Sequence, residues 1–221
     1  MSRSIPDSIH AIYCIGRNYG AHAKELGNAI PESPVVFLKS PAAVRGLQES
    51  GKIAYPSEIF HHELELVLQI GASIPGSSGD ILTRIKAIGL GLDITRREVQ
   101  NRLKKEGLPW TDAKSFRGSA VLGSFLELPA NLSAAQIADM INSASFSLWV
   151  NGELRQKGSP CDMIFSCDKL LMTLQTSHGL HHGDLIFTGT PEGVGPLKAG
   201  DTIRMQLISG EKVVIDESGV F

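Results

Sequence analysis

The chain has 221 residues, of which 42% are hydrophobic and 20% are charged, and its formal charge at pH 7 is −2. These values are typical of a globular protein, and the length suffices for one large domain with a buried core. The balanced charge favours no nucleic-acid partner, and no apolar run approaches the roughly 20 residues that span a bilayer.

The N-terminal segment and the cysteines predict the cellular compartment. Residues 1–10 lack the apolar core of a signal peptide, so we expect a cytoplasmic protein. The cysteines are Cys14, Cys161 and Cys167, an odd number without Cys-x-x-Cys spacing. We therefore expect reduced thiols rather than a disulfide framework or a zinc site.

The predicted elements begin with a short strand over residues 9–15. A helical stretch follows through Leu26 and ends at Gly27, and it carries His22 and Glu25 on one face. Prolines at 31 and 34 interrupt the chain before a second strand over Val35–Lys39. Lys39 is therefore expected where a strand meets a loop.

An alternating run over residues 62–70 predicts the next strand. Glu63 and Glu65 share one face of it, whereas Leu64, Leu66, Leu68 and Ile70 occupy the other. The two carboxylates can converge on one point, and Mg2+ and Mn2+ prefer oxygen ligands. The pair alone has a simpler explanation, because a half-buried antiparallel strand exposes polar side chains at alternate positions.

A third acid, Asp93, closes a second apolar run within residues 81–94. On that strand Gly89 and Gly91 share the face of Asp93, so we expect the glycines to leave room for a ligand. An unpaired buried carboxylate costs several kcal/mol. A positive group should therefore lie near Asp93, either a metal ion or one of Arg96 and Arg97.

A loop and a helix are predicted on either side of the strand that ends at Asp93. Residues 71–79 are rich in Gly, Ser and Pro and predict a flexible loop. Thr95 and Glu98 have capping-box spacing, which predicts a helix from Thr95 to Gly107 with Arg97 and Gln100 on one face.

The C-terminal half is predicted to be mainly β-structure. Asn151-Gly152 indicates a hairpin turn after an alternating segment, and Asp168–His178 has helical spacing up to Gly179. A strand over Asp184–Thr188 opens into a glycine-rich turn whose N–H groups can bind an anion. Two further strands flank residues 209–212.

Several motifs, in their order along nearly the whole chain, resemble the fumarylacetoacetate hydrolase family. They are Gly16-Arg17-Asn18-Tyr19, His22 with Glu25, Phe37-Leu38-Lys39, His62-Glu63-Leu64-Glu65, Asp93-Ile94-Thr95-Arg96-Arg97-Glu98-Val99-Gln100, Lys114-Ser115-Phe116 and Thr188-Gly189-Thr190-Pro191-Glu192-Gly193-Val194-Gly195. The resemblance implies a mixed α/β, β-rich fold, a β-roll or sandwich with few short helices. It also implies a homodimer, a single catalytic domain over residues 1–221 and a mobile lid over residues 16–30.

The resemblance also implies roles for individual residues. Glu63, Glu65 and Asp93 match the family's ligands for one divalent ion, Mg2+ or Mn2+. His22 and Glu25 match its lid dyad, and Lys114 matches a lysine near the bound substrate. The positions expected in the substrate pocket are Arg17, Lys39, Arg97, Gln100 and Thr190.

The subgroup that the chain resembles contains short acylpyruvases and enzymes acting on oxaloacetate. We therefore expect a metal-dependent hydrolase that cleaves a C–C bond of acylpyruvates, such as acetylpyruvate or fumarylpyruvate, to give pyruvate and a carboxylic acid. Glu25 would orient His22 as the base for the attacking water, and the metal and Lys114 would stabilise the pyruvate enolate.

Other functions remain open on the sequence. Oxaloacetate decarboxylation and oxaloacetate keto–enol tautomerisation pass through the same enolate, and the His22–Glu25 dyad favours hydrolysis among the three. A non-catalytic module with a structural metal ion is a different class, which the dyad and Lys114 disfavour. The acyl group, the preferred metal and the oligomer size are not determined by these residues.

Overall fold

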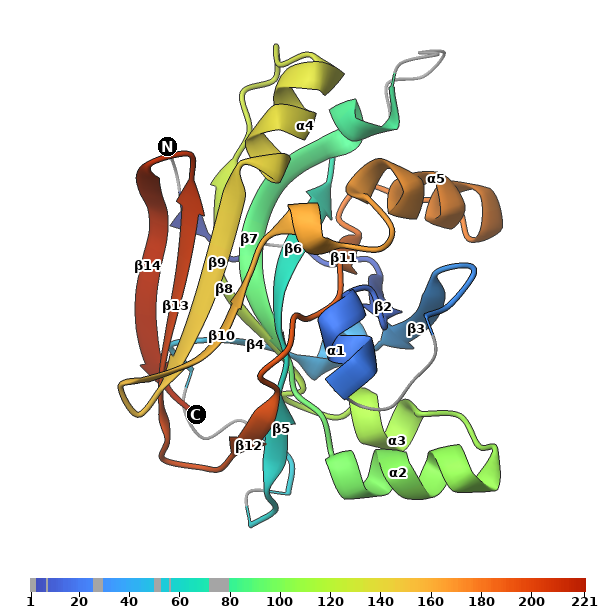
Figure 1. Cartoon of the computed structure of the whole chain (residues 1–221), viewed down its shortest axis with the longest axis vertical. Coiled ribbons are helices and arrows are strands. Elements are labelled where there is room, and N and C mark those ends of the chain that lie inside the picture. Colours follow the sequence, from blue (N-terminus) through green and yellow to red (C-terminus); the bar gives the residue numbers. More distant parts are fainter. Residues whose placement is uncertain (1–2, 7, 26–29, 50–52, 56, 72–79) are drawn as a thin grey trace.

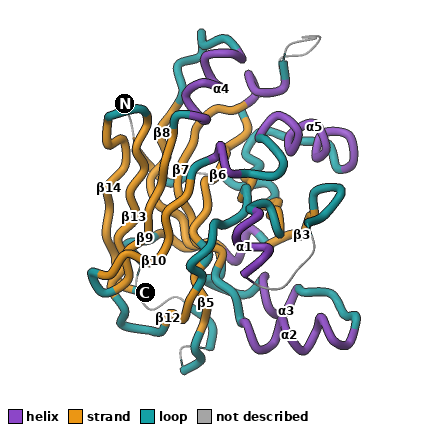
Figure 2. Tube along the Cα trace, viewed as in Figure 1, coloured by secondary structure: helices purple, strands orange, loops and turns teal. Residues whose placement is uncertain are grey.

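The computed structural model describes residues 3–6, 8–25, 30–49, 53–55, 57–71 and 80–221. In this part of the chain the strands form a large sheet, a second sheet packed on one of its faces, and a short two-stranded ribbon (Figure 1, Figure 2). The β-rich mixed α/β roll expected from the sequence is confirmed.

The large sheet has the order β1-β8-β7-β6-β11-β2-β3, and β4 pairs with β8 outside this path. Most neighbours are antiparallel, but β2 pairs with β11, and β4 with β8, in parallel. Its strands are β1 (Arg3–Ser4), β2 (Ile12–Gly16), β3 (Val35–Lys39), β4 (Val44–Gly46), β6 (Leu64–Ile70), β7 (Ile85–Asp93), β8 (Ala120–Glu127) and β11 (Leu185–Phe187).

The second sheet has the order β10-β9-β13-β14 and is antiparallel throughout. Its strands are β9 (Ala144–Val150), β10 (Glu153–Gly158), β13 (Thr202–Ser209) and β14 (Lys212–Val220), and the separate ribbon pairs β5 (Phe60–His62) with β12 (Gly195–Leu197). Leu66 and Leu90 of the large sheet and Leu148 and Met205 of the second belong to one buried cluster. The main core therefore lies between the two sheets.

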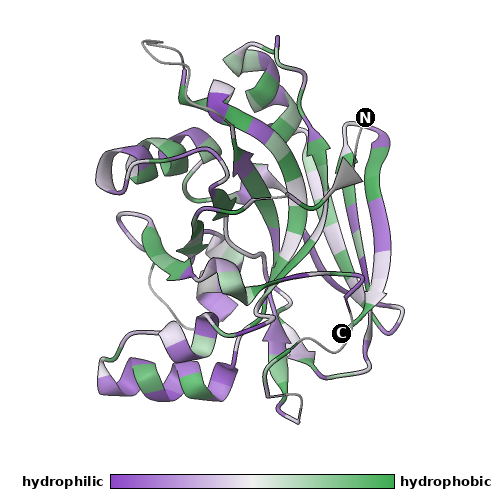
Figure 3. Ribbon diagram, turned by 180° about the vertical axis from the view of Figure 1, so that it is seen from behind, coloured by the Kyte–Doolittle hydropathy of each residue, from purple (hydrophilic) through white to green (hydrophobic). Residues whose placement is uncertain are grey.

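Short helices lie around the sheets (Figure 1). The α-helices are α1 (Gly20–Glu25), α2 (Arg97–Glu106), α3 (Thr111–Lys114), α4 (Ala134–Asn142) and α5 (Cys167–Ser177), with 3-10 turns at Pro41–Ala43, Ile81–Arg84 and Pro160–Asp162. Figure 3 shows mostly hydrophilic residues along α2, whereas the central strands are largely hydrophobic. No helix among the described residues is long and apolar enough to span a membrane.

Several predicted elements match the structure closely. The strand over Val35–Lys39 is β3, and the hairpin turn at Asn151-Gly152 has φ angles of 52° and 81° at its two residues. The predicted helix end at Leu26-Gly27 and most of the predicted loop, residues 72–79, lie outside the described residues.

The predicted capping box at Thr95 is wrong. Helix α2 begins at Arg97, and its N-cap residue, Arg96, makes no side-chain capping bond. The hydroxyl of Thr95 instead donates to the carbonyl of Asp93 at 3.1 Å and accepts a hydrogen bond from Lys114. The Thr95 hydroxyl is therefore engaged by Asp93 at the end of β7 and by Lys114, and it does not cap the helix. The end of α2 is as predicted, because Gly107 has φ 66°.

The expectation that Gly89 and Gly91 leave room for a ligand is also wrong. A Cβ atom on Gly89 would lie 2.9 Å from the Phe125 ring, and one on Gly91 would lie 2.8 Å from the Phe187 ring. The glycines instead let the rings of Phe125 and Phe187 pack directly against the strand. These rings belong to a separate buried cluster on the face of the large sheet opposite the second sheet.

Candidate functional site

Three carboxylates converge at one end of the central strands, as the sequence predicts. Glu63 lies just before β6, Glu65 is the second residue of β6, and Asp93 ends the neighbouring β7. The backbone N–H of Asp93 donates to the carbonyl of Glu63 at 2.9 Å, which fixes the register of the two segments. All three side chains are buried, and their oxygens lie within 4.8 Å of one another.

Two lysines neutralise Asp93. The ammonium of Lys39 lies 2.8 Å from its Oδ1, and that of Lys114 lies 2.7 Å from its Oδ2. Lys114 also contacts Oε2 of Glu63 at 2.7 Å and therefore bridges two of the carboxylates. Burial alone would lower the pKa of Lys114, but Asp93 and Glu63 outweigh it and raise that pKa, so the ammonium stays charged.

The two arginines that the sequence suggested for Asp93 have other partners. Arg97 pairs with Oε1 of Glu63 and donates to Oε1 of Gln100 at 2.6 Å. Arg96 makes a two-pronged ion pair with Glu58, with both contacts at 2.7 Å. At the end of β7 the side chain of Asp93 points toward β3 and α3, and the lysines of those elements therefore contact it.

Lys39 differs in position from the other basic residues. Its side chain is completely buried, and its ammonium also donates to the backbone carbonyls of Lys114 and Ile94. Lys39 contacts Asp93 but does not line the pocket. The other residues expected in the pocket do line it, and they are Arg17, Arg97, Gln100 and Thr190. Lys39 therefore holds Asp93 in place and balances its charge.

Glu65 is the carboxylate without a cationic partner among the described residues. Its Oε2 accepts a hydrogen bond from the backbone N–H of Gly189 at 2.6 Å. Burial, with the negative charges of Asp93 and Glu63, raises the pKa of Glu65 well above its usual range. Burial also opposes the charge of Glu63, but Lys114 and Arg97 hold the pKa of Glu63 low.

These carboxylates fit a divalent ion. A bound cation would offset the burial and the carboxylate repulsion that raise the pKa of Glu65, and an all-oxygen donor set suits Mg2+ or Mn2+. Among the described residues three carboxylates form this cluster, so the remaining coordination positions would be left to water or to a substrate.

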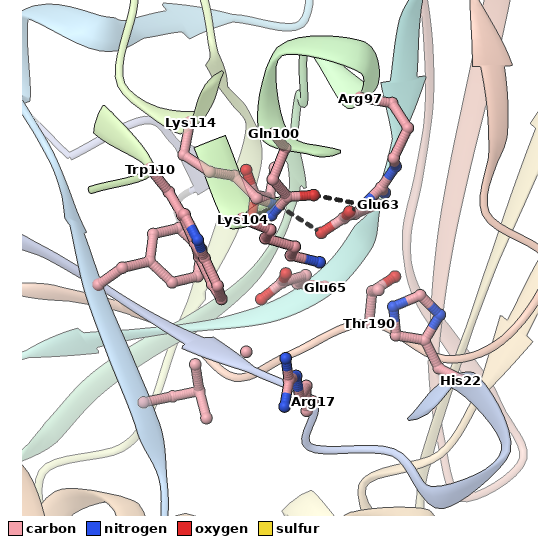
Figure 4. Close-up of a pocket in the computed structure, with 14 residues that line it drawn as sticks. Arg17, His22, Glu63, Glu65, Arg97, Gln100, Lys104, Trp110, Lys114 and Thr190 are labelled. Carbon is pink, nitrogen blue, oxygen red and sulfur yellow. Dashed lines mark hydrogen bonds and ion pairs between the residues drawn. The ribbon is translucent and has the colours of Figure 1, made fainter. Parts of the chain in front are cut away.

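His22 of α1 lines the same pocket and pairs with Glu25 of the same helix. Nδ1 of His22 lies 3.1 Å from Oε2 of Glu25, and His22 is buried. The other oxygen of Glu25 accepts a hydrogen bond from the N–H of Gly193 at 3.3 Å. Figure 4 shows the imidazole of His22 beside Thr190, across from Glu63 and Glu65. Residues 26–29 of the expected lid lie outside the described residues.

The glycine-rich turn binds anions, but these are the protein's own carboxylates. Its Gly189 N–H holds Glu65, and its Gly193 N–H holds Glu25. The hydroxyl of Thr190 donates to the carbonyl of Leu64 at 2.8 Å and accepts from Gln156 at 2.8 Å. Because that hydroxyl has a single proton, it has no donor left for a substrate.

Asn18 fixes the loop that carries Arg17. Its amide donates to the carbonyls of Phe165 and Thr188, at 3.1 and 2.8 Å, and its oxygen accepts from the N–H of Phe165 at 2.8 Å. Arg17 itself has φ 59°, in the left-handed region that costs energy for a non-glycine residue. The loop is thus held in one conformation with Arg17 in the pocket lining.

Lys104 and Trp110 line the pocket but were not predicted as site residues from the sequence. The ammonium of Lys104 lies 5.3 Å from the centroid of the Trp110 ring. Lys104 follows Arg97 and Gln100 at helical spacing, so extending that face by one turn would have found it. The sequence contains no comparable signal for Trp110.

Known proteins resemble this chain in sequence. The family model described as fumarylacetoacetate (FAA) hydrolase C-terminal matches residues 11–215. Oxaloacetate tautomerase FAHD1, mitochondrial, of Arabidopsis thaliana is 41% identical over 212 residues, which cover 93% of this chain and 89% of that protein. Oxaloacetate tautomerase YcgM of Escherichia coli K12 is 38% identical over 200 residues, which cover 89% and 88% of the two chains.

A solved structure gives a second kind of relative. The fumarylpyruvate hydrolase from Pseudomonas aeruginosa, crystallised in complex with Mn2+ and pyruvate, matches with a TM-score of 0.78 and 34% identity. The match covers 97% of this chain and 91% of that chain.

Proposed function

The chain belongs to the fumarylacetoacetate hydrolase family, and from this premise we propose that it is a divalent-metal-dependent enzyme that interconverts the keto and enol forms of oxaloacetate. The observation that carries the proposal is one pocket lined by Glu63, Glu65, Asp93 and His22. Outside this lining, Glu25 pairs with His22 at 3.1 Å. The relatives named oxaloacetate tautomerases support this reaction over the hydrolysis that the sequence favoured.

The acidic residues define one half of the chemistry. Mg2+ or Mn2+ held by Glu63, Glu65 and Asp93 would supply a Lewis acid for the oxygens of a 2-oxo acid. Lys114 keeps Glu63 and Asp93 together through its two contacts at 2.7 Å. Its positive charge also favours the negative charge that develops on the 2-oxygen as an enolate forms.

His22 supplies the other half, which is proton transfer. The 3.1 Å contact from Nδ1 to Glu25 favours a proton on Nδ1 and leaves Nε2 as the free base. In the proposed reaction Nε2 removes a proton from C3 of the keto form, and a proton is then delivered to the 2-oxygen. The net change is a shift of one proton within the substrate, so no water is consumed and no bond between carbons is broken.

Hydrolysis of acylpyruvates is the second candidate. The same His22–Glu25 pair could take a proton from water as that water attacks the distal carbonyl, and a structural relative is a fumarylpyruvate hydrolase. Oxaloacetate decarboxylation would need the acidic residues and Lys114 but no base, so the paired His22 favours it least.

The family resemblance also supports a proposal about assembly. We propose a homodimer whose subunits each consist of one catalytic domain. The shared core of the two sheets supports the single domain. Light scattering of the purified protein would give the molar mass, and a monomer would contradict the dimer without affecting the proposed chemistry.

The test of function is a substrate comparison with Mg2+, each reaction being repeated with EDTA. Faster loss of oxaloacetate enol than the spontaneous rate, without pyruvate, would support the tautomerase. Pyruvate from acetylpyruvate or fumarylpyruvate would support the hydrolase, and pyruvate from oxaloacetate would support the decarboxylase. Inactivity on all three would contradict every enzymatic proposal and favour a metal-binding module.

A further inference from the structure

Two positive side chains in the pocket have no negative partner in the part of the chain that the structure describes. Arg17 and Lys104 both line it, and neither forms an ion pair with a carboxylate among the described residues. The other basic groups near the acidic residues are engaged, because Lys39 and Lys114 contact Asp93 and Arg97 pairs with Glu63. The positive charges of Arg17 and Lys104 are therefore not neutralised by the described carboxylates of the pocket.

The surroundings of Lys104 make its charge costly. The residue is half-buried, with its ammonium 5.3 Å from the Trp110 ring centroid. Burial, followed by the positive charges of Arg97 and Arg17, lowers the pKa of Lys104. The Trp110 ring offers a cation–π contact but carries no negative charge. An anion between Lys104 and Arg17 would relieve the repulsion.

The two cations also point to the same space. Figure 4 shows Lys104 and Arg17 reaching toward the middle of the pocket from different sides, with Glu65 between them in this view. Arg17 is held there by a strained backbone with φ 59° next to the firmly bound Asn18. A strained backbone at an arginine that pairs with no described acid points to a ligand as the partner of its side chain.

We propose that Lys104, together with Arg17, binds the second carboxylate of a 2-oxo diacid, and that Trp110 covers it. The inference rests on the proposed function for the placement of the first carboxylate and 2-oxo group at the acidic residues. Lys104 is thus a specificity-determining residue. It selects four-carbon diacids over monocarboxylic 2-oxo acids, which would leave both cations unpaired.

A neighbouring apolar groove offers the alternative occupant of this end of the pocket. Phe37, Trp110 and Lys114 line both the pocket and this groove, which continues along Val35, Leu38 and Leu108. An uncharged acyl chain would follow that groove and would not use Lys104. Replacing Lys104 should therefore weaken the binding of a diacid and leave the binding of an uncharged acyl substrate unchanged.

The experiment compares two ligands that cannot enolise and differ by one carboxylate, malate and lactate. Calorimetry in excess Mg2+ should show that malate binds at least about tenfold more tightly than lactate, the ratio expected for a charge-assisted contact. Lys104→Gln should remove this preference and leave lactate binding unchanged. Lys105→Gln is the matched control, because Lys105 is exposed on the same helix and should keep the preference.

Each contrary outcome overturns the inference. Equal binding of malate and lactate by the unmodified protein would do so, and this result requires no variant to fold. Equal loss of both ligands in Lys104→Gln would show that Lys104 does not act on the second carboxylate. The readout is independent of turnover: a malate preference without oxaloacetate tautomerisation would refute the proposed function and leave the carboxylate site standing.

Discussion

The ammonium of Lys114 lies 2.7 Å from Oδ2 of Asp93 in the interior of the protein. The same ammonium contacts Glu63, so one positive charge holds two metal-ligand candidates together. The stability of the metal-free protein should therefore depend on Lys114, and a bound cation should reduce this dependence.

Replacing Lys114 by Met should therefore destabilise the metal-free protein by about 3–5 kcal/mol, the usual effect of removing one partner of a buried ion pair. Mg2+ should raise the melting temperature of the variant more than that of the unmodified protein, because the ion replaces the missing positive charge. Thermal unfolding with and without Mg2+ measures both effects, and Lys105→Met is the control. An equal response to Mg2+ in both proteins would contradict the proposed metal position.

Glu65→Gln should weaken divalent-metal binding by at least about tenfold, because it removes a charged oxygen ligand. The fold should be retained, since the glutamine oxygen can still accept the hydrogen bond from Gly189. Titration with Mn2+, followed by electron paramagnetic resonance, gives the affinity. Glu192→Gln is the control, because Glu192 is an exposed acid on the same turn. Unchanged affinity in Glu65→Gln would refute its role as a ligand.

His22→Ala should lower turnover by about 10²- to 10⁴-fold, the usual contribution of a general acid or base, while metal affinity stays the same. The enol assay and the Mn2+ titration measure these two quantities separately. His182→Ala, at an exposed position, should change neither. Full activity in His22→Ala would exclude His22 as the proton-transfer group.

Gly189→Ala should unfold more easily and bind metal more weakly. A Cβ atom there would lie 2.7 Å from Cβ of Asn18, and Gly189 has φ 101°, so the N–H that orients Glu65 would be displaced. Gly200 also has a positive φ, 92°, but no atom would lie within 4 Å of its Cβ. Gly200→Ala thus shows the cost of backbone strain alone, about 1–3 kcal/mol. Equal losses of stability and of metal affinity in both variants would refute the contact with Asn18.

Metal binding should depend on pH through Glu65. Its raised pKa means that Glu65 keeps a proton where an ordinary carboxyl is ionised, and a cation must displace that proton. Affinity should therefore rise with pH up to the raised pKa and then level off. Calorimetric titrations between about pH 5 and about pH 8, in buffers with different ionisation enthalpies, would detect the released proton. Glu65→Gln should release none, and a flat pH profile in the unmodified protein would contradict the prediction.

The convergence of Glu63, Glu65 and Asp93 could be predicted because strand alternation sets the direction of each side chain. The partners of Asp93 could not, because Lys39 and Lys114 reach it through pairings between distant segments. Local patterns contain no information on such contacts.

Other errors have equally specific causes. A capping signal depends on a free hydroxyl, and that of Thr95 is committed to Asp93 and Lys114. A glycine signals space without saying what fills it, and at Gly91 the occupant is the ring of Phe187.

The placement of the site also separates parts that can change from parts that cannot. Glu65 and Asp93 are buried residues of the central strands β6 and β7, whereas His22 and Lys104 stand on short helices at the surface of the fold. New loops or helices could therefore be grafted around an unchanged ion site to redirect the enolate toward another product. One scaffold could in this way be adapted, by evolution or by engineering, to several reactions of 2-oxo acids.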